Sequence, residues 1–374
     1  MQRMTRTLIH TPKSDGYWMP GEFERHAGSW MLWPERLDNW RAGAIPAQQA
    51  FAAVASAIAR FEPVSVGVSA AQFEFARAKL DPRVRVIEIS NNDAWMRDVG
   101  PTFVVNAAGK RRAVDWQFNS WGGLNGGMYF PWDQDDLVAQ KVAAIEGVNR
   151  YRAPLIMEGG AIHADGQGTL LVTEQCLLNT NRNPHLSKAE IESLLCKYTG
   201  ASTIIWLGDG VIDDETDGHI DNLACFARPG EVCLTFPANR RDAQWRVSSD
   251  ALERLQAARD ARGRMLKVHK LPSPGPLRMT AAEAAGVQHR AGAKPRQAGM
   301  RLAASYANFY IANGGIIVPL LDSRTDATAV AKLRRIFPER KVVGVPGREI
   351  LLGGGNIHCI TQQVPAIKAR RSPL

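Results

Sequence analysis

The order of elements along the chain repeats: a helix, a strand, a short polar break and a hairpin recur several times. The clearest copies of the break are GGAIHA at 159–164 and GGNIHC at 354–359, which align without gaps, and ANGGIIV at 312–318 is a looser third copy. A Gly-Gly-apolar run also opens ordinary strands, so the recurring order around it carries more weight. Units that each need a neighbour to bury a sheet tend to close into a ring. A ring would bring the polar breaks to one axis.

No flexible linker divides the 374 residues, so we expect one domain over residues 1–374. A hydrophobic content of 45% is enough for a large core. Apolar periodicity predicts helices near 46–61, 136–145, 187–198, 239–262 and 327–337, each leading into a strand. Ser187 and Glu190 form a capping box at the start of the third helix. Residues 272–299, rich in Pro, Gly and Ala, are expected to form an extended surface loop.

Charge and cysteine content exclude several classes of protein. The net charge is +9, but the basic residues are scattered and no nucleic-acid-binding motif accompanies them, which favours a solvated basic surface over a nucleic-acid partner. The five cysteines are odd in number and include no CxxC, which argues against a disulfide framework or a zinc site. No run approaches the ~18 apolar residues of a membrane span, and the N-terminal residues lack the apolar core of a signal peptide. We expect a cytoplasmic protein with no membrane partner.

One segment of this basic chain is acidic. The run GDGVIDDETDGHID at 208–221 holds five aspartates and one glutamate. Only nearby charges act strongly once salt screens beyond about 8 Å. The local acidity therefore favours a cationic ligand.

The stretch LLGGGNIHCITQQVP at 351–365 carries the most reactive side chain. Its apolar start reads as a strand that breaks at three glycines, where backbone and ligand can approach closely because no Cβ intrudes. Cys359 follows directly. A buried structural cysteine is the alternative, but the glycines and the polar neighbours favour a thiol that meets substrate.

The polar breaks also carry Asp98, Glu158, His219 and Asp221, and we expect each to follow the innermost strand of its unit. Asp98, Glu158 and His219 are 60 and 61 residues apart, close to one repeat. Several carboxylates around a thiol would raise its pKa unless a cation sits among them, and the natural cation is the substrate. A guanidinium fits because its planar fork of N–H groups pairs bidentately with carboxylates. Attack by Cys359 on its carbon, with His219 moving protons, would turn a guanidine into a ureido group.

Six motifs resemble the agmatine deiminase (agmatine iminohydrolase) family, part of the guanidine-modifying superfamily that includes peptidylarginine and arginine deiminases. They are MPGEFERHAGSWMLWP, NDAWMRD, MEGGAIHADG, DDETDGHIDN, ASYANFYIANGG and LGGGNIHC, and they span nearly the whole chain. The resemblance implies an α/β fold, a five-bladed α/β propeller of pseudo-repeated ββαβ units around a central active site. It also implies a homo-oligomer, no cofactor or metal, and conversion of agmatine to N-carbamoylputrescine and ammonia, a step of polyamine (putrescine) synthesis from arginine.

The resemblance implies a role for each motif residue. Cys359 in GGGNIHC would be the nucleophile that forms a covalent thiouronium intermediate, His219 in GHID the acid and base, and Glu158 in MEGG an aid to proton transfer and binding.

Four further residues would bind substrate. Asp98 in WMRD and Asp221 in HID would hold the guanidinium, Glu215 in DDET the amine end, and Trp95 in DAWMRD the alkyl chain.

Plainer roles stay open for several of these residues. Asp98 could pair with the adjacent Arg97, Glu158 could cap a turn, and Trp95 or Trp121 could belong to the core. The aligned histidines of the repeated motif, His163 and His358, are expected to be structural, and Asp213 and Asp214 solvated.

Three rival functions use other features. The spacing of Asp217, His219 and Asp221 on a strand resembles the manganese ligands of ureohydrolases, which would release urea from the same substrate. A deiminase of arginine or peptidylarginine would use the same thiol, although the acidic segment favours a doubly cationic substrate. A non-enzymatic ring that binds nucleic acid or a polyamine would leave the Cys-His-carboxylate set without a task.

Overall fold

The chain has a mixed α/β fold in which one arrangement of strands recurs. The computed structural model describes residues 5–367, so residues 1–4 and 368–374 of the expected domain lie outside the described part. In each of the five sheets of that part, two antiparallel strands are followed by a helix and by a strand parallel to the second. Four units are β5 (Thr102–Asn106), β6 (Arg111–Gln117), α4 (Val138–Ile145) and β7 (Arg150–Ile156); β8 (His163–Ala164), β9 (Thr169–Thr173), α6 (Lys188–Thr199) and β10 (Thr203–Leu207); β11 (Ala224–Arg228), β12 (Glu231–Phe236), α8 (Gln244–Ala257) and β13 (Lys267–Pro272); and β14 (Tyr310–Ala312), β15 (Gly315–Leu320), α10 (Asp326–Ile336) and β16 (Lys341–Pro346).

The fifth sheet joins the two ends of the described chain. Strand β17 (Gln362–Pro365) pairs antiparallel with β2 (His26–Leu32), so that Gln362 lies opposite Trp30. The sheet continues through α1 (Ile45–Ile58) to the parallel strand β3 (Val64–Val68), and through α2 (Phe73–Lys79) to β4 (Arg85–Glu88). Strand β1 (Tyr17–Trp18) adds to the edge of β5.

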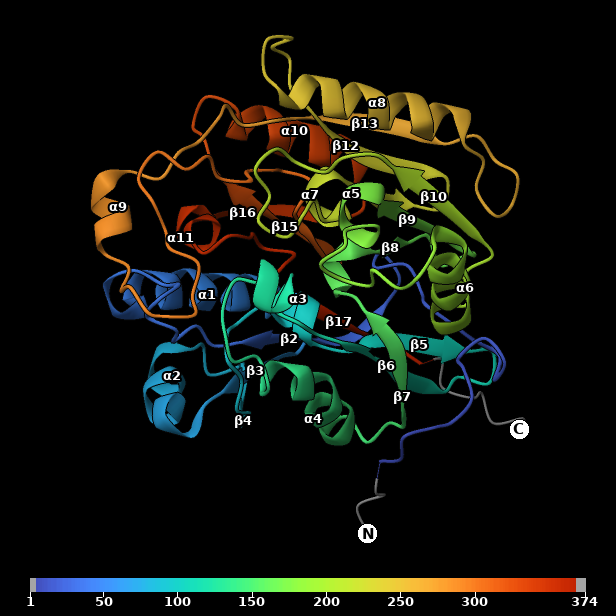
Figure 1. Ribbon diagram of the computed structural model, residues 1–374, viewed down its shortest axis with the longest axis horizontal. Helices are drawn as coiled ribbons and strands as arrows, with labels where there is room; N and C mark the ends of the chain where they lie inside the picture. The colour runs from blue at the N-terminus through green and yellow to red at the C-terminus, as the bar shows by residue number, and fades with distance from the viewer. Residues whose placement is uncertain (1–4, 368–374) are drawn as a thin grey trace.

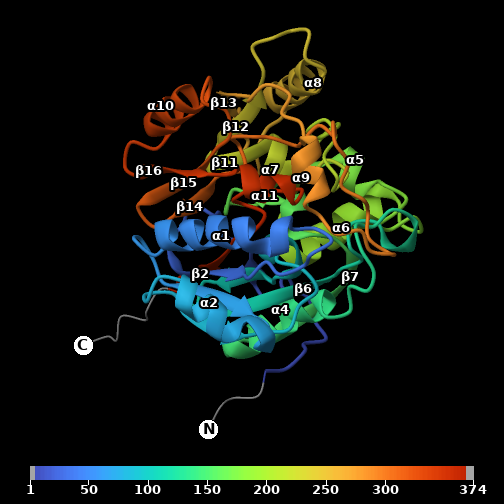
Figure 2. The same ribbon diagram turned by 90° about the vertical axis from the view of Figure 1, so that its left-hand side faces the viewer.

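The longer helices lie at the periphery of the molecule and the strands lie inside them (Figures 1 and 2). Helix α10 shows how a unit is held: Ala329, Leu333 and Ile336, spaced by three or four residues, are buried in one cluster with Ile316 and Val318 of β15. The first strands of neighbouring units contact one another, β5 with β17 and β8 with β11.

Short helices lie between the units. They are α3 (Met96–Val99), α7 (Ile220–Leu223), α9 (Ala281–Ala285) and α11 (Arg348–Leu352), whereas α5 (Glu174–Leu177) lies inside a unit, between β9 and α6. The expectation of a strand before the glycines is wrong, because Leu351 and Leu352 belong to α11 and Cys359 lies in a turn ahead of β17. A short apolar run fits a buried helix as well as a strand.

The capping box is present: Glu190 N–H donates to Ser187 Oγ at 3.3 Å, and Ser187 N–H donates to the Glu190 carboxylate at 2.8 Å. The helix expected at 239–262 is shorter, since α8 starts at Gln244. The side chains of Asn239 and Asp242 each accept the backbone N–H two residues on, both at 3.0 Å, and such local turns compete with the helix.

Residues 272–299 are more than a surface loop. They include α9, which Thr280 and Glu283 begin with a capping box, and they reach back to the centre, where Arg296 is buried. Within residues 5–367, no helix combines the length and apolarity needed to cross a membrane.

Candidate active site

The five side chains expected at the axis come together in the structure. Asp98 lies on α3, Glu158 follows β7, His219 and Asp221 lie at the start of α7, and Cys359 precedes β17. All five are buried. The expectation that they follow an innermost strand is wrong: each lies between the last strand of one unit, at the edge of its sheet, and the first strand of the next. These connections face the centre, so four of them build one site.

Two glycines allow these connections to approach closely. A Cβ on Gly160 would lie 2.6 Å from His219 Nδ1 and 2.8 Å from Asp98 Oδ1. A Cβ on Gly355 would lie 3.1 Å from Cys359 Sγ and closer still to the Trp95 ring. A larger residue at either position would displace site side chains, and the close approach of a ligand to the glycine run stays a prediction.

The Cys359 thiol lies between an amide and a carboxylate. Asn308 Nδ2 donates to Sγ at 3.2 Å, and Asp221 Oδ2 lies 3.6 Å from Sγ. Burial raises the pKa of the Cys359 thiol well above its ordinary value, and the charges of Asp221 and Asp98 raise it further. Both effects disfavour the thiolate, in the direction expected for a thiol among acids.

His219 is placed to carry a proton. Its Nε2 lies 3.3 Å from Glu158 Oε2, and its Nδ1 lies 3.9 Å from Asp98 Oδ1. Burial alone would lower the pKa of His219, but Asp98, the Cys176 thiol and Glu158 hold it well above its ordinary value. The imidazole is therefore a buried cation that can donate a proton.

Asp98 faces the site with His219, 3.9 Å away, as its ion-pair partner, and the His219 charge lowers its pKa. Its carboxylate accepts hydrogen bonds from Gly160 N–H at 2.9 Å and from Trp121 Nε1 at 3.0 Å. Burial raises the pKa of Asp98 to about 6, and the charges of Asp221 and Glu158 act in the same direction. Among the described residues no arginine or lysine forms an ion pair with Asp98, so a cationic ligand can fill that role.

Glu158, by contrast, already has a cation. Arg182 Nε donates to Glu158 Oε1 at 2.8 Å, and its Nη1 donates to Asp217 Oδ2 at 2.8 Å and to the carbonyl of Trp121 at 2.7 Å. Burial would raise the pKa of Glu158, but Arg182 and His219 hold it below its usual value. Glu158 is therefore a fixed carboxylate that orients His219.

A cavity beside Cys359 is lined by Trp95, Asp98 and Glu215. The Trp95 ring stacks on Trp40 at 5.2 Å, which holds one apolar face against the cavity. Glu215 pairs with Arg296, and Lys294 Nζ lies 3.9 Å from its Oε1, which accepts no hydrogen bond from the described residues. Asp221 Oδ1 likewise accepts no hydrogen bond from the described residues. Two buried carboxylate oxygens without donors are available to a ligand.

The Asp217, His219 and Asp221 set does not form a metal site. His219 precedes helix α7 and Asp221 lies within it, so the three side chains do not alternate along a strand. Asp217 instead forms an ion pair with Arg182.

Two other groups of His, Cys and Glu have ligand atoms within 4.8 Å of one another. They are Glu158, Cys176 and His219, and Glu22, His163 and His358. A buried arginine adjoins each, Arg182 at Glu158 and Arg97 at Glu22, and its charge opposes a bound cation.

Sequence reasoning missed five functional residues and misplaced one acid. The missed residues are Glu22, Arg182, Arg296, Asn308 and the side chain of His358. Glu22 lies in the motif MPGEFERHAGSWMLWP and Asn308 in ASYANFYIANGG, but neither residue differs from its neighbours in a way that indicates a role in the site. The arginines were read as surface charge, although both are buried, and Asp214, expected to be solvated, is buried and accepts from Thr216 and Asn222.

Known proteins share this sequence and fold over nearly its whole length. Residues 18–365 match the family model of Porphyromonas-type peptidyl-arginine deiminase. The chain is 56% identical to agmatine deiminase of Ectopseudomonas mendocina, covering 96% of this chain and 98% of the relative. It is 58% identical to agmatine deiminase of Pseudomonas aeruginosa, covering 95% and 97%. The solved structure of agmatine deiminase of Enterococcus faecalis superposes with a TM-score of 0.94 at 50% identity, covering 97% and 99%.

Fold, site and relatives agree on a guanidine-modifying enzyme. The chain belongs to the Porphyromonas-type peptidyl-arginine deiminase family. Within that family, the relatives that match it at 56–58% identity bear the name agmatine deiminase.

Proposed function

We propose that the chain hydrolyses agmatine to N-carbamoylputrescine and ammonia through a covalent bond to Cys359. One observation carries the proposal: a buried thiol lies beside Asp98 and Asp221, and neither carboxylate has an arginine or lysine partner among the described residues. Their only ion-pair partners among the described residues are the histidines His219 and His358, and a guanidinium adds a further positive charge and the N–H donors that Asp221 Oδ1 lacks. The names of the full-length relatives give the particular guanidine.

The substrate activates its own nucleophile. Asp98 and the free Oδ1 of Asp221 bind the guanidinium nitrogens and aim the central carbon at Sγ. The bound positive charge lowers the pKa of the Cys359 thiol, which then loses its proton to solvent. The thiolate attacks the carbon and gives a tetrahedral adduct.

His219 moves the protons of both half-reactions. As a cation it donates a proton to the departing nitrogen, which leaves as ammonia and yields the thiouronium. Neutral His219, held by Glu158, then takes a proton from water, and the hydroxide adds to the same carbon. Expulsion of the thiolate leaves the ureido product and frees Cys359. Such a product fits a step of polyamine synthesis from arginine.

The other end of the substrate decides specificity. Glu215 Oε1 accepts no hydrogen bond from the described residues and has Lys294 Nζ at 3.9 Å, so it suits the ammonium group of the substrate, and Trp95 covers the methylene chain between the two charges. Arg296 and Lys294 also line the cavity, so a carboxylate could be accepted there, and arginine is the substrate to compare. Turnover of arginine as efficient as that of agmatine would refute the assignment.

We propose that the five ββαβ units form one domain, a five-bladed propeller with the site at its axis. The recurring unit, the contacts between first strands and the pairing of β17 with β2 support this closure. Five unpaired cysteines support a cytoplasmic location. A homo-oligomer, and a reaction without metal or cofactor, remain predictions, which light scattering and chelation test.

The test is an assay of EDTA-treated protein with agmatine that measures ammonia, ureido product and urea in one sample. We expect ammonia and ureido product in equal amounts, and their loss in Cys359→Ala while circular dichroism is unchanged. The control is Cys196→Ser, which changes a half-buried thiol on α6 and should keep full activity. Urea that appears only with manganese, or an active Cys359→Ala protein, would refute the proposal.

A further inference from the structure

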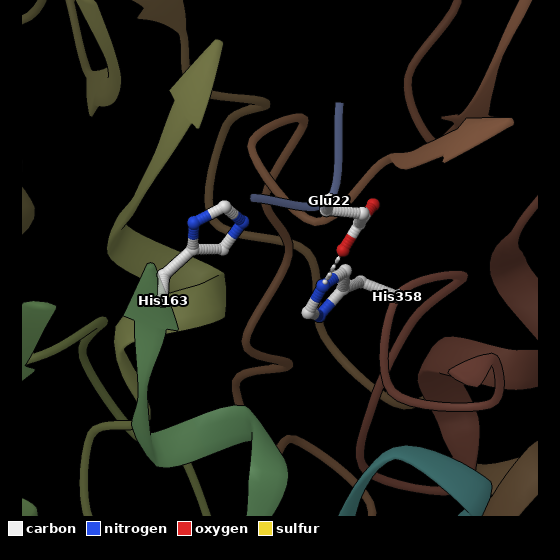
Figure 3. Close-up of side chains that lie close together, drawn as sticks. All are labelled: Glu22, His163 and His358. Carbon is white, nitrogen blue, oxygen red and sulfur yellow. Dashed lines mark hydrogen bonds and ion pairs between the residues drawn. The ribbon is translucent and has the colours of Figure 1, made fainter. Parts of the chain in front are cut away.

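The residue before the thiol, His358, is bonded at both ring nitrogens to buried carboxylates. Its Nδ1 lies 2.8 Å from Asp221 Oδ2, and its Nε2 lies 2.7 Å from Glu22 Oε2 (Figure 3). A neutral imidazole has only one N–H, whereas an imidazolium donates from both nitrogens. Burial and the Arg97 charge would lower the pKa of His358, but Glu22 and Asp221 raise it above its ordinary value. The ring is therefore a buried cation between two anions.

The far end of this chain of contacts is fixed. Glu22 Oε1 accepts the backbone N–H of Ile311 at 2.8 Å, and Arg97 Nη2 lies 3.3 Å from Glu22 Oε2. Glu22, Arg97 and His358 are all buried. Since these two contacts hold the Glu22 carboxylate in place, Glu22 sets the position of the His358 ring.

The backbone of His358 orients a second neighbour of the thiol. Its N–H donates to Asn308 Oδ1 at 2.9 Å, which turns Asn308 Nδ2 toward Cys359 Sγ. Both groups that contact the sulfur, the Asn308 amide and the Asp221 carboxylate, are thus held by one residue.

We propose that His358 is a positioning residue whose imidazolium, anchored by Glu22, holds the Asp221 carboxylate charged and aimed at the reacting carbon. The proposal rests on the proposed function, in which Asp221 binds the guanidinium beside Cys359. His358 itself touches neither the substrate nor the sulfur through its ring; it acts through Asp221.

His163 supplies a matched comparison, because it occupies the position of His358 in the other copy of the repeated motif. Its ring lies 5.9 Å from that of His358, but its Nδ1 accepts the backbone N–H of Phe226 at 3.3 Å, and within residues 5–367 it bonds to no carboxylate. Burial lowers the pKa of His163 to about 4. In Figure 3 both rings lie beside Glu22, yet only His358 is joined to it.

The same contacts disfavour a metal at this cluster. Because Nδ1 of His163 accepts a hydrogen bond, its proton lies on Nε2, the atom that faces Glu22.

The groups facing His358 are Glu22 ahead of β2, Asp221 on α7, Arg97 on α3 and His163 on β8. The charges of Arg97 and His219 also lower the pKa of Asp221, but among residues 5–367 only His358 forms an ion pair with it.

The first test is kinetic, with kcat and KM for agmatine measured from pH 5 to 9. In His358→Gln, Asp221 loses the cation bonded to its Oδ2, so Asp221 should titrate together with Asp98 and the acid limb of kcat/KM should move to higher pH. Misplacement of Asp221 should also lower kcat/KM at pH 8 by about 100-fold. Glu22→Gln should move the acid limb and lower kcat/KM in the same directions, but by less. His163→Gln should leave the acid limb in place and kcat/KM within about two-fold of the wild type.

The second test does not need turnover and separates this proposal from the proposed function. In protein labelled with ¹⁵N-histidine, both ring nitrogens of His358 should stay protonated at pH 7.5, and the signal is identified by its loss in His358→Gln. A neutral His358 overturns the proposal even if agmatine is turned over. An acid limb that stays in place in His358→Gln also overturns the proposal. If His358→Gln does not fold, the same result in Glu22→Gln overturns it. A wild-type protein inactive on agmatine refutes the proposed function alone.

Discussion

His163 and His358 come from equivalent positions of two copies of one motif, and their rings stack at 5.9 Å. Residues 195 positions apart in the sequence therefore meet where the copies meet. The two rings differ in what they touch: His358 bonds to Glu22 and Asp221, whereas His163 accepts a backbone N–H of Phe226. The repeat has kept the position of the imidazole and changed its charge, so that one copy serves packing and the other serves the site.

Asn308 is predicted to support the thiolate. Asn308→Ala removes the N–H donor that lies 3.2 Å from Cys359 Sγ. Since a hydrogen bond to a charged group contributes about 1.5–3 kcal/mol, kcat should fall by about 10–100-fold. Alkylation of Cys359 by iodoacetamide at pH 8 should slow as well. The exposed Asn239 is the control site, and equal alkylation rates in Asn308→Ala and Asn239→Ala would contradict the role.

Asp98 is predicted to set the acid limb of activity. Its pKa is raised to about 6, so the carboxylate that binds the guanidinium is charged above that pH and becomes neutral below it. kcat/KM should therefore fall as pH drops through about 6. Asp98→Asn should lower kcat/KM at pH 8 by about 10–100-fold and remove this limb. An Asp98→Asn protein that keeps the wild-type limb would assign the titration to another group.

Glu215 is predicted to bind the amine end of agmatine and to take no part in the chemistry. Glu215→Gln should raise KM for agmatine by about ten-fold and leave kcat unchanged, as expected for a contact made equally in the ground and transition states. Butylguanidine, which lacks the amine, is the matched substrate, and its kinetics should be the same in both proteins. A similar loss on both substrates would mean that Glu215 acts through Arg296, its ion-pair partner.

Arg182 is predicted to hold the site together. Arg182→Met leaves Glu158 buried without its cation, which should lower the free energy of unfolding by about 3–5 kcal/mol in urea titrations. Arg324→Ala is the control, because its side chain is 77% exposed and its pair with Asp322 should contribute no more than about 1 kcal/mol. Equal midpoints for the two variants would show that the Arg182 pair adds nothing to stability.

The sequence was informative where a residue type and its motif point to one chemistry. Cys359, His219 and the acids of the breaks were found this way, and the structure brings them together. Partners far apart in sequence gave no such signal: Arg182 meets Glu158 across 24 residues, and Asn308 meets Cys359 across 51. A short apolar run could not distinguish α11 from a strand, since its few residues fit both periods.

The pairing of β17 with β2 has a consequence for a chain emerging from the ribosome. One edge of β2 stays open until β17 arrives more than 300 residues later, and an open edge can pair with other nascent chains. Cys359 reaches its place in the same last step, just ahead of β17. Enzymatic activity should therefore appear only when β17 has paired with β2, and the rate of that late pairing sets how long each new molecule needs protection from aggregation.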